Sequence, residues 1–311
     1  MSTKSKIWLI VAISLMLVGG IIFVGTMAAL NWNFLGLNTT QYETNKYNVS
    51  EEFSNISINT DTTDVVFLKS DDGNCKIECF ERENENHTVT VLDGMLKIDI
   101  NDTRKWYDHI TFFGFDTPQL KIYLPQNNYG ALFINVSTGD IKIPDSFTFE
   151  GIDIKGSTGD VNCKASVTND LKINISTGCT KIDNITADNI NLMVSTGETY
   201  LTDVKCNSLV SSGDTGDIIF KNVDAGKEFN VTRSTGDIKF DQCDADELYI
   251  KTSTGDVEGK LCTSKIFICE TNTGDIIVPP TTEGGNCQVI TDTGDIKMQV
   301  KATISNGYFI R

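Results

Sequence analysis

Acidic residues recur along this 311-residue chain at a spacing that could bind cations. A carboxylate follows eight of nine Thr-Gly pairs, and its unbroken C-terminal run is Asp237, Asp256, Asp275 and Asp295. Carboxylate oxygens are the ligands that Ca²⁺ prefers in proteins. If successive copies stack about 5 Å apart, neighbouring carboxylates repel each other by about 0.8 kcal/mol even at the dielectric constant of water. Some interaction must therefore offset this repulsion.

Two interpretations of these carboxylates compete. In the first, each Asp caps its own turn by accepting hydrogen bonds from backbone N–H groups or Thr hydroxyls, as Asp beside Thr and Gly commonly does. In the second, Ca²⁺ bridges carboxylates on successive copies. The repeat is not the glycine-rich nonapeptide that binds calcium in other β-rolls. We therefore favour capping and predict no required metal or cofactor.

Catalytic groups are sparse in the sequence. An enzyme that cuts acidic polysaccharides needs a groove in which carboxylates meet Arg or Lys, and Arg233 with Asp214 and Asp237 is the one such cluster within the repeats. Arg233 is equally suited to pairing with an acid on a neighbouring turn. The two histidines, His87 and His109, have no Ser or Cys partner in any motif. We predict that the protein is not an enzyme.

Nine cysteines in an exported chain would ordinarily indicate disulfides. Their phase favours buried thiols, because six fall where inward, small apolar side chains are expected: Cys163, Cys206, Cys243, Cys262, Cys269 and Cys287. A Cys243–Cys262 bridge is the alternative, since these two occupy one slot in consecutive copies. Cys75 and Cys79 lie too far apart along a strand to bridge. The odd cysteine count and the lack of a Cys-x-x-Cys pair argue against zinc.

An internal repeat positions all these residues. The glycines of the nine Thr-Gly pairs lie 19 or 20 residues apart: Gly139, Gly159, Gly178, Gly197, Gly216, Gly236, Gly255, Gly274 and Gly294. The positions seven and five before each glycine and two and four after it are mostly apolar, and those seven and nine after it mostly carry smaller residues. Such period-two alternation predicts short strands with one buried face, three to each repeat.

Stacking equivalent strands of successive repeats gives every apolar face a partner. Propeller blades take about 40 residues, and isolated hairpins cannot bury an apolar face. We therefore predict an all-β, parallel β-helix-like β-solenoid of about nine 19–20-residue coils over residues 131–311. Cys179 and Glu198 replace the usual Asp, and Thr180 and Thr199 replace the apolar residue after it, so we expect those two coils to be looser.

Residues 47–130 carry a blurred copy of the repeat, in which Thr63 stands where the glycine should be. We predict that they form an N-terminal β cap, because an uncovered solenoid end pairs with other chains. Residues 106–115 are rich in aromatic side chains. We expect them to pack over the cap, with an exposed binding loop as the alternative.

The N-terminus has the pattern of a membrane anchor. Residues 7–30 carry no charge, and at about 1.5 Å per residue they reach across a hydrocarbon core of about 30 Å. A cleaved signal peptide is the competing interpretation, although its apolar region is usually about 7–15 residues long. Lys4 and Lys6 place the N-terminus in the cytoplasm. We expect residues 1–30 to form a cytoplasmic stub and transmembrane anchor, residues 31–46 a polar stalk, and the rest to lie outside the cell.

Tyr123-Leu124-Pro125, followed by Ser-Thr-Gly-Asp-Ile/Val units behind one membrane segment, resembles the bacterial putative-adhesin β-strand-repeat family. The likeness covers roughly residues 47–311, and it implies a cell-envelope domain of unknown function. The net charge of −16 argues against nucleic acid as a partner. We expect a membrane-anchored extracytoplasmic rod that acts in adhesion, envelope scaffolding or envelope-stress sensing, with an envelope protein or glycan as ligand.

Two other functions stay open from the sequence. One is a self-polymerising filament, which requires an exposed apolar last coil at residues 307–311. The other is a polysaccharide-processing enzyme that uses Arg233.

Overall fold

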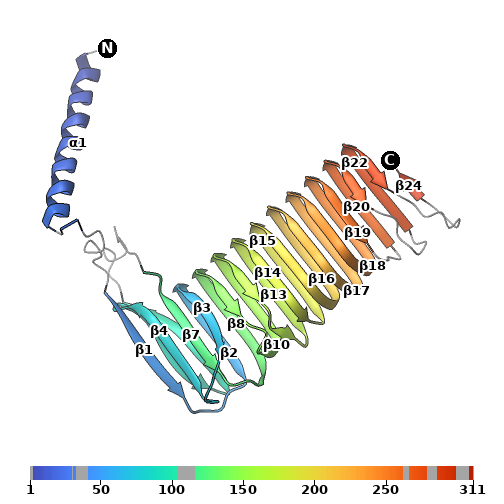
Figure 1. The fold of residues 1–311 in the computed structure, drawn as a ribbon, viewed down its shortest axis with the longest axis horizontal. Coiled ribbons are helices and arrows are strands. Elements are labelled where there is room, and N and C mark those ends of the chain that lie inside the picture. Colours follow the sequence, from blue (N-terminus) through green and yellow to red (C-terminus); the bar gives the residue numbers. More distant parts are fainter. Residues whose placement is uncertain are drawn as a thin grey trace.

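The computed structural model describes residues 3–29, 31–32, 41–103, 116–261, 266–278, 286–298 and 308–310. One helix, α1 (Thr3–Ala29), precedes an all-β solenoid of about eight turns, as Figure 1 shows. Nine Thr-Gly corners delimit eight complete turns, so the predicted solenoid is confirmed with slightly fewer turns than the nine expected. By length and composition, α1 could cross a membrane, and none of its apolar window is buried.

Seven strands form the N-terminal cap, which extends the solenoid and covers its end. They are β1 (Tyr42–Val49), β2 (Asn55–Thr62), β3 (Asp64–Lys69), β4 (Cys75–Arg82), β5 (Glu85–Leu92), β6 (Met95–Asp102) and β7 (Gln119–Leu124). β1 begins inside the range that we expected to be stalk. The aromatic insertion at residues 106–115 lies outside the described residues.

Two turns of the cap stack in the same manner as the solenoid. β2 pairs in parallel with β8, with Thr62 opposite Thr138, and β3 pairs with β9. Thr63 therefore takes the place of a corner glycine, as predicted. On the other side of this turn, β6 pairs in parallel with β2 and β7 with β3. Beyond them, β5 lies antiparallel to β6, β4 to β7 and β1 to β4, so antiparallel strands close the stack.

The remaining strands form the regular turns. They are β8 (Asn128–Thr138), β9 (Ile141–Ile143), β10 (Thr148–Thr158), β11 (Val161–Cys163), β12 (Ser166–Val167), β13 (Asp170–Thr177), β14 (Thr180–Thr186), β15 (Asn189–Thr196), β16 (Thr199–Thr215), β17 (Ile218–Thr235), β18 (Ile238–Thr254), β19 (Val257–Leu261), β20 (Ile266–Thr273), β21 (Ile276–Val278), β22 (Asn286–Thr293), β23 (Ile296–Met298) and β24 (Tyr308–Ile310). Figure 1 shows them stacked along a rod with the cap at its N-terminal end.

Equivalent residues of successive turns lie opposite one another across parallel strands. The threonine before the corner glycine shows this register, because Thr196, Thr215, Thr235, Thr254 and Thr273 face one another in sequence. The alternating apolar side chains of all three sides are buried, and they belong to one contiguous core that runs from Ile56 to Val289. The predicted inward positions are therefore confirmed where the structure describes their side chains.

A second corner in several turns was not foreseen from the sequence. Four residues six positions after a corner glycine have φ between 53° and 57°: Asn184, Asp203, Asn222 and Gln242. Asn and Asp tolerate this left-handed conformation better than other residues with a side chain. The chain therefore turns a corner there without a glycine.

Each corner glycine packs directly on the corner of the preceding turn. Gly255 has a φ of +143°, and a Cβ built on it would lie 2.1 Å from the carbonyl oxygen of Gly236. A side chain at this position therefore meets backbone that cannot move without shifting a whole turn.

We predict that Gly255→Ala destabilises the solenoid by about 2 kcal/mol or more, because strain and a backbone clash add together. The measurement is thermal unfolding followed by circular dichroism. Gly226→Ala is the matched control, since the nearest atom to its added Cβ is 3.8 Å away. Equal losses in the two variants would contradict the prediction.

Candidate functional site

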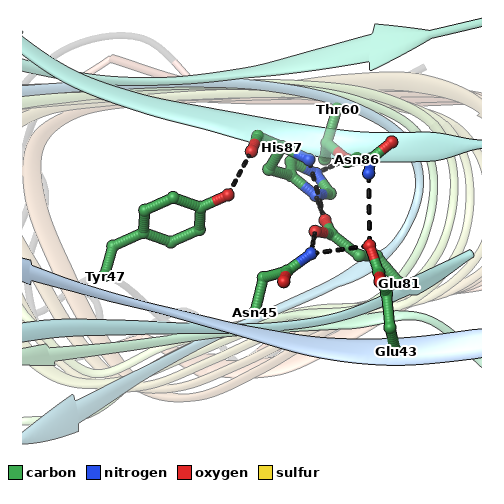
Figure 2. Close-up of polar contacts among 7 residues, drawn as sticks. All are labelled: Glu43, Asn45, Tyr47, Thr60, Glu81, Asn86 and His87. Atoms are coloured by element: carbon green, nitrogen blue, oxygen red, sulfur yellow. Dashed lines mark hydrogen bonds and ion pairs between the residues drawn. The ribbon is translucent and has the colours of Figure 1, made fainter. Parts of the chain in front are cut away.

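A buried cluster of polar side chains lies inside the cap (Figure 2). Cys79 and Glu81 come from β4 and His87 from β5, and these residues are 0%, 1% and 3% exposed. One ligand atom from each lies within 4.8 Å of the other two. A thiol, a carboxylate and an imidazole thus converge in the interior, and these are side chains that bind metals.

Strand alternation and one tight turn bring the cluster together. β4 turns Cys79 and Glu81 to the interior, and β5 turns Glu85 and His87 inward in the same way. The two strands are antiparallel, with Arg82 opposite Glu85 and a turn between them. The turn folds β5 back on β4, and the inward side chains at their joined ends therefore meet.

Hydrogen bonds fix the position of Glu81 and His87. Oε2 of Glu81 lies 2.6 Å from Nδ1 of His87 and accepts the backbone N–H of His87 at 2.8 Å. Nε2 of His87 lies 2.8 Å from Oγ1 of Thr60 on β2. Nδ2 of Asn45 on β1 donates to Oε1 of Glu81 at 2.7 Å. Figure 2 shows these groups facing one another between the strands.

The electrostatics of the cluster oppose nucleophilic chemistry. Burial raises the pKa of the Cys79 thiol to about 12, and the Glu81 carboxylate adds to the rise. Burial, then the charges of Cys79 and Glu81, also raise the pKa of Tyr47, whose hydroxyl donates to the carbonyl oxygen of His87 at 2.8 Å. Because the thiolate is the reactive form of cysteine, Cys79 is inert at neutral pH without a bound cation.

No motif in the sequence indicates this cluster. We described His87 as lacking a Cys partner, because Cys79 is eight residues away and fits no motif. One feature of the sequence points to the cluster: polar residues occupy inward positions on two strands that a short turn joins. His109, the other histidine, lies outside the described residues.

Arg233 lies inside the solenoid and not in a groove. It is 1% exposed, and its Nη1 donates to the carbonyl oxygen of Val194 at 2.7 Å. Its Nη2 donates to Oγ1 of Thr199 at 3.4 Å. Gly213 leaves the space for it, because a Cβ there would lie 1.9 Å from Nη1. Burial lowers the pKa of Arg233, although Asp214 and other acids oppose this. The guanidinium therefore has no access to a polysaccharide.

The two coils that we expected to be looser contain continuous strands, β14 and β16. Thr180 and Thr199 at their starts are fully buried, and Thr199 supplies an acceptor for Arg233. The polar replacement at Thr199 accordingly accommodates a buried cation from a later turn.

Seven corner Asp residues, from Asp64 to Asp275, each bind the turn that follows their own. Oδ1 of Asp237 accepts the backbone N–H of Asp256 at 3.0 Å, Asp256 accepts that of Asp275 at 2.8 Å, and Asp275 accepts that of Asp295 at 2.8 Å. The same bond begins at Asp64 in the cap. The carboxylates are acceptors as the capping interpretation expected, but they cap the next turn. Donation by N–H groups offsets the repulsion along the column.

The described cysteines of the inward set are buried thiols. Cys163, Cys206, Cys243 and Cys269 lie in the core. Cys262 and the side chain of Cys287 lie outside the described residues, so the Cys243–Cys262 bridge stays a hypothesis. Cys75 and Cys79 are both buried on the inner face of β4.

A family model described as Toastrack DUF4097 matches residues 53–214 and 202–308. No curated protein matches the chain.

Three solved structures illustrate the likeness. A protein named "putative adhesin" from Parabacteroides distasonis ATCC 8503 is 17% identical with a TM-score of 0.47, and the match covers 84% of this chain and 98% of that one. A "putative adhesin" from Bacteroides fragilis NCTC 9343 is 17% identical with a TM-score of 0.40, covering 83% and 97%. A "putative lipid binding protein" from Parabacteroides distasonis ATCC 8503 is 13% identical with a TM-score of 0.43, covering 84% and 98%.

We predict that Asp256→Ala destabilises the solenoid by about 1 kcal/mol, because the backbone N–H of Asp275 loses its acceptor. Asp256→Asn is the control, since its amide oxygen still accepts and its stability should stay near wild type. Thermal unfolding with and without Ca²⁺ tests both interpretations of the acidic column. A melting temperature that rises with Ca²⁺ in the wild type but not in Asp256→Asn would favour the cation bridge instead.

We predict that Arg233→Met leaves the stability within about 1 kcal/mol of wild type, because Met fills much of the space and removes a buried charge. Arg233→Ala should lose about 2–4 kcal/mol, since it leaves a cavity beside Gly213. Chemical denaturation of both variants measures the difference, and equal losses would count against this account of the buried guanidinium.

Proposed function

The chain belongs to the Toastrack DUF4097 family, and we propose that it is a non-enzymatic membrane-anchored protein that displays a rigid, acidic β-solenoid outside the cell. The rod serves adhesion or envelope scaffolding, and its ligand is an envelope protein or glycan. The family itself carries no assigned activity, so the proposal rests on the architecture of this chain.

The observation that carries the proposal is one apolar helix joined to a filled rod. Large apolar side chains cover α1 and are exposed, among them Trp8, Met16 and Ile21. An exposed apolar surface of this length requires a lipid environment. The solenoid interior is a single packed core, and so the protein offers ligands its outer faces.

One outer face has a feature suited to ligand contact. Phe133 is 43% exposed, and with Glu150, Asp153 and Lys172 it lines a shallow hollow of about 270 Å³. An exposed aromatic ring flanked by charged groups can contribute apolar contact and hydrogen bonds together. This hollow lies on the turns next to the cap, on strands β8, β10 and β13.

The alternative of a self-polymerising filament has less support. The antiparallel strands β5 and β1 end the parallel stack at the cap, and a head-to-tail filament needs both ends open. Its proposed discriminator, the side chains of residues 307–311, lies outside the described residues. The enzyme alternative depended on Arg233, which is buried.

We expect a membrane-impermeant maleimide to label Lys172→Cys in intact cells and to label Ser5→Cys only after the cells are permeabilised. Both substitutions are made with Cys179→Ser, which removes the one partly exposed thiol among the cysteines whose side chains the structure describes. The reason is that Ser5 precedes the membrane-spanning segment and Lys172 follows it. Labelling of Ser5→Cys in intact cells, with Lys172→Cys protected, would reverse the topology and overturn the proposal.

The same cysteines test ligand contact. A photoreactive maleimide on Lys172→Cys should yield adducts of defined mass with envelope components. Lys251→Cys is the matched control, because the side chains of Lys172 and Lys251 are similarly exposed, at 54% and 62%, and Lys251 is far from the hollow. Equal or absent adducts at both positions would contradict ligand contact at this face.

A further inference from the structure

We propose that Cys79, Glu81 and His87 bind a zinc ion in the interior of the cap. Their donors are one sulfur, one oxygen and one nitrogen atom. Zn²⁺ takes all three donor types, whereas Ca²⁺ and Mg²⁺ take oxygen almost exclusively. The mixed set therefore selects a transition metal of zinc's character.

The distances within the cluster are close to those that a zinc ion requires. Zinc bonds of about 2.0–2.3 Å in a tetrahedron place ligand atoms roughly 3.3–3.7 Å apart. All three donor atoms lie within 4.8 Å of one another. The Nδ1–Oε2 pair at 2.6 Å must open by less than about 1 Å. Rotations of side chains on β4 and β5 are sufficient for such shifts.

The surrounding hydrogen bonds already have the form of a second shell. Thr60 lies against Nε2 of His87, which leaves Nδ1 as the atom that faces Glu81. Asn45 holds Oε1 of Glu81 and leaves Oε2 directed at the imidazole. In metal sites, partners of this kind fix the tautomer of the histidine and the orientation of the carboxylate. Zinc would replace the direct Glu81–His87 contact and keep both outer bonds.

Binding is balanced by the release of one proton. The Cys79 thiol gives up its proton to solvent, and its sulfur forms a bond to the metal as a thiolate. The proton shared between Nδ1 of His87 and Oε2 of Glu81 moves to Nε2, which then donates it to Oγ1 of Thr60 and leaves Nδ1 free for the metal. Glu81 contributes a carboxylate and His87 a neutral imidazole, so two negative charges meet the two positive charges of Zn²⁺. The fourth position of the tetrahedron is left to water. The ion then links β4 to β5 and, through Thr60, to β2.

The proposed site differs in kind from the zinc sites against which the cysteine pattern argues. That argument relied on the odd cysteine count and the missing Cys-x-x-Cys pair, which describe sites built mainly from thiolates. A site built from one thiolate, one carboxylate and one imidazole does not require a Cys-x-x-Cys pair in the sequence.

The test uses the full-length chain in detergent, freed of metal and titrated with Zn²⁺ and with Co²⁺ as a spectroscopic probe. We expect one equivalent of tightly bound metal, a sulfur-to-cobalt charge-transfer absorption, and a melting temperature several degrees higher with Zn²⁺. Cys79→Ser should lose the absorption and at least tenfold in affinity. Glu81→Gln and His87→Gln should each weaken binding by at least tenfold.

Cys75→Ser is the matched control, because Cys75 is a second buried thiol on the same face of β4 but is not in the cluster. Its affinity and its cobalt absorption should equal those of the wild type. Circular dichroism of each metal-free variant shows whether it is folded. Three results would overturn the proposal: loss of the cobalt absorption in Cys75→Ser, retention of that absorption in Cys79→Ser, or binding of less than one equivalent of metal by the wild type.

Discussion

The structure depends on one constraint, which is that each turn completes its backbone hydrogen bonds on the turns beside it. Equivalent residues must then lie in register. For example, the backbone N–H of Gly159 donates to the carbonyl oxygen of Thr177, and that of Gly178 donates to the carbonyl oxygen of Thr196. Register places each corner glycine on the corner before it, so a side chain does not fit at Gly255 or at the other corner glycines. It also places each corner carboxylate beside the next N–H, which turns a column of like charges into a column of acceptors.

The same constraint explains how a polar group is accommodated in the core. An arginine cannot fit among in-register side chains unless other turns yield space and acceptors. Gly213, which has no side chain, leaves space beside Arg233. The hydroxyl of Thr199 and the carbonyl of Val194 accept hydrogen bonds from the guanidinium of Arg233. Thr199 and Gly213 lie on one turn, Val194 on the turn before it and Arg233 on the turn after it. Residues that look like unrelated departures from the repeat therefore form one compensated unit.

Structural features that recur in many repeats could be predicted from the sequence, and features that occur only once could not. Inward positions such as Ile238 and Phe240 recur in every turn, and the averaged pattern identifies three sides and a shared core. The left-handed corner at Gln242 lacks a consistent residue type and gave no signal. The β4–β5 turn occurs once, and whether Glu81 and His87 meet depends on pairing that no periodicity specifies.

The buried polar cluster lies where the repeat ends, and this location has a physical reason. Among the described residues the parallel stack ends at the cap, because β5 and β1 run antiparallel to their neighbours and pair with a different hydrogen-bond pattern. The last layer therefore need not consist of aliphatic residues that match a neighbouring turn. Polar side chains can occupy it when neighbouring groups satisfy their bonds, as Asn45, Thr60 and the backbone of His87 do for Glu81 and the imidazole. The end of the repeat is thus also the place where, among the described residues, thiol, carboxylate and imidazole groups converge.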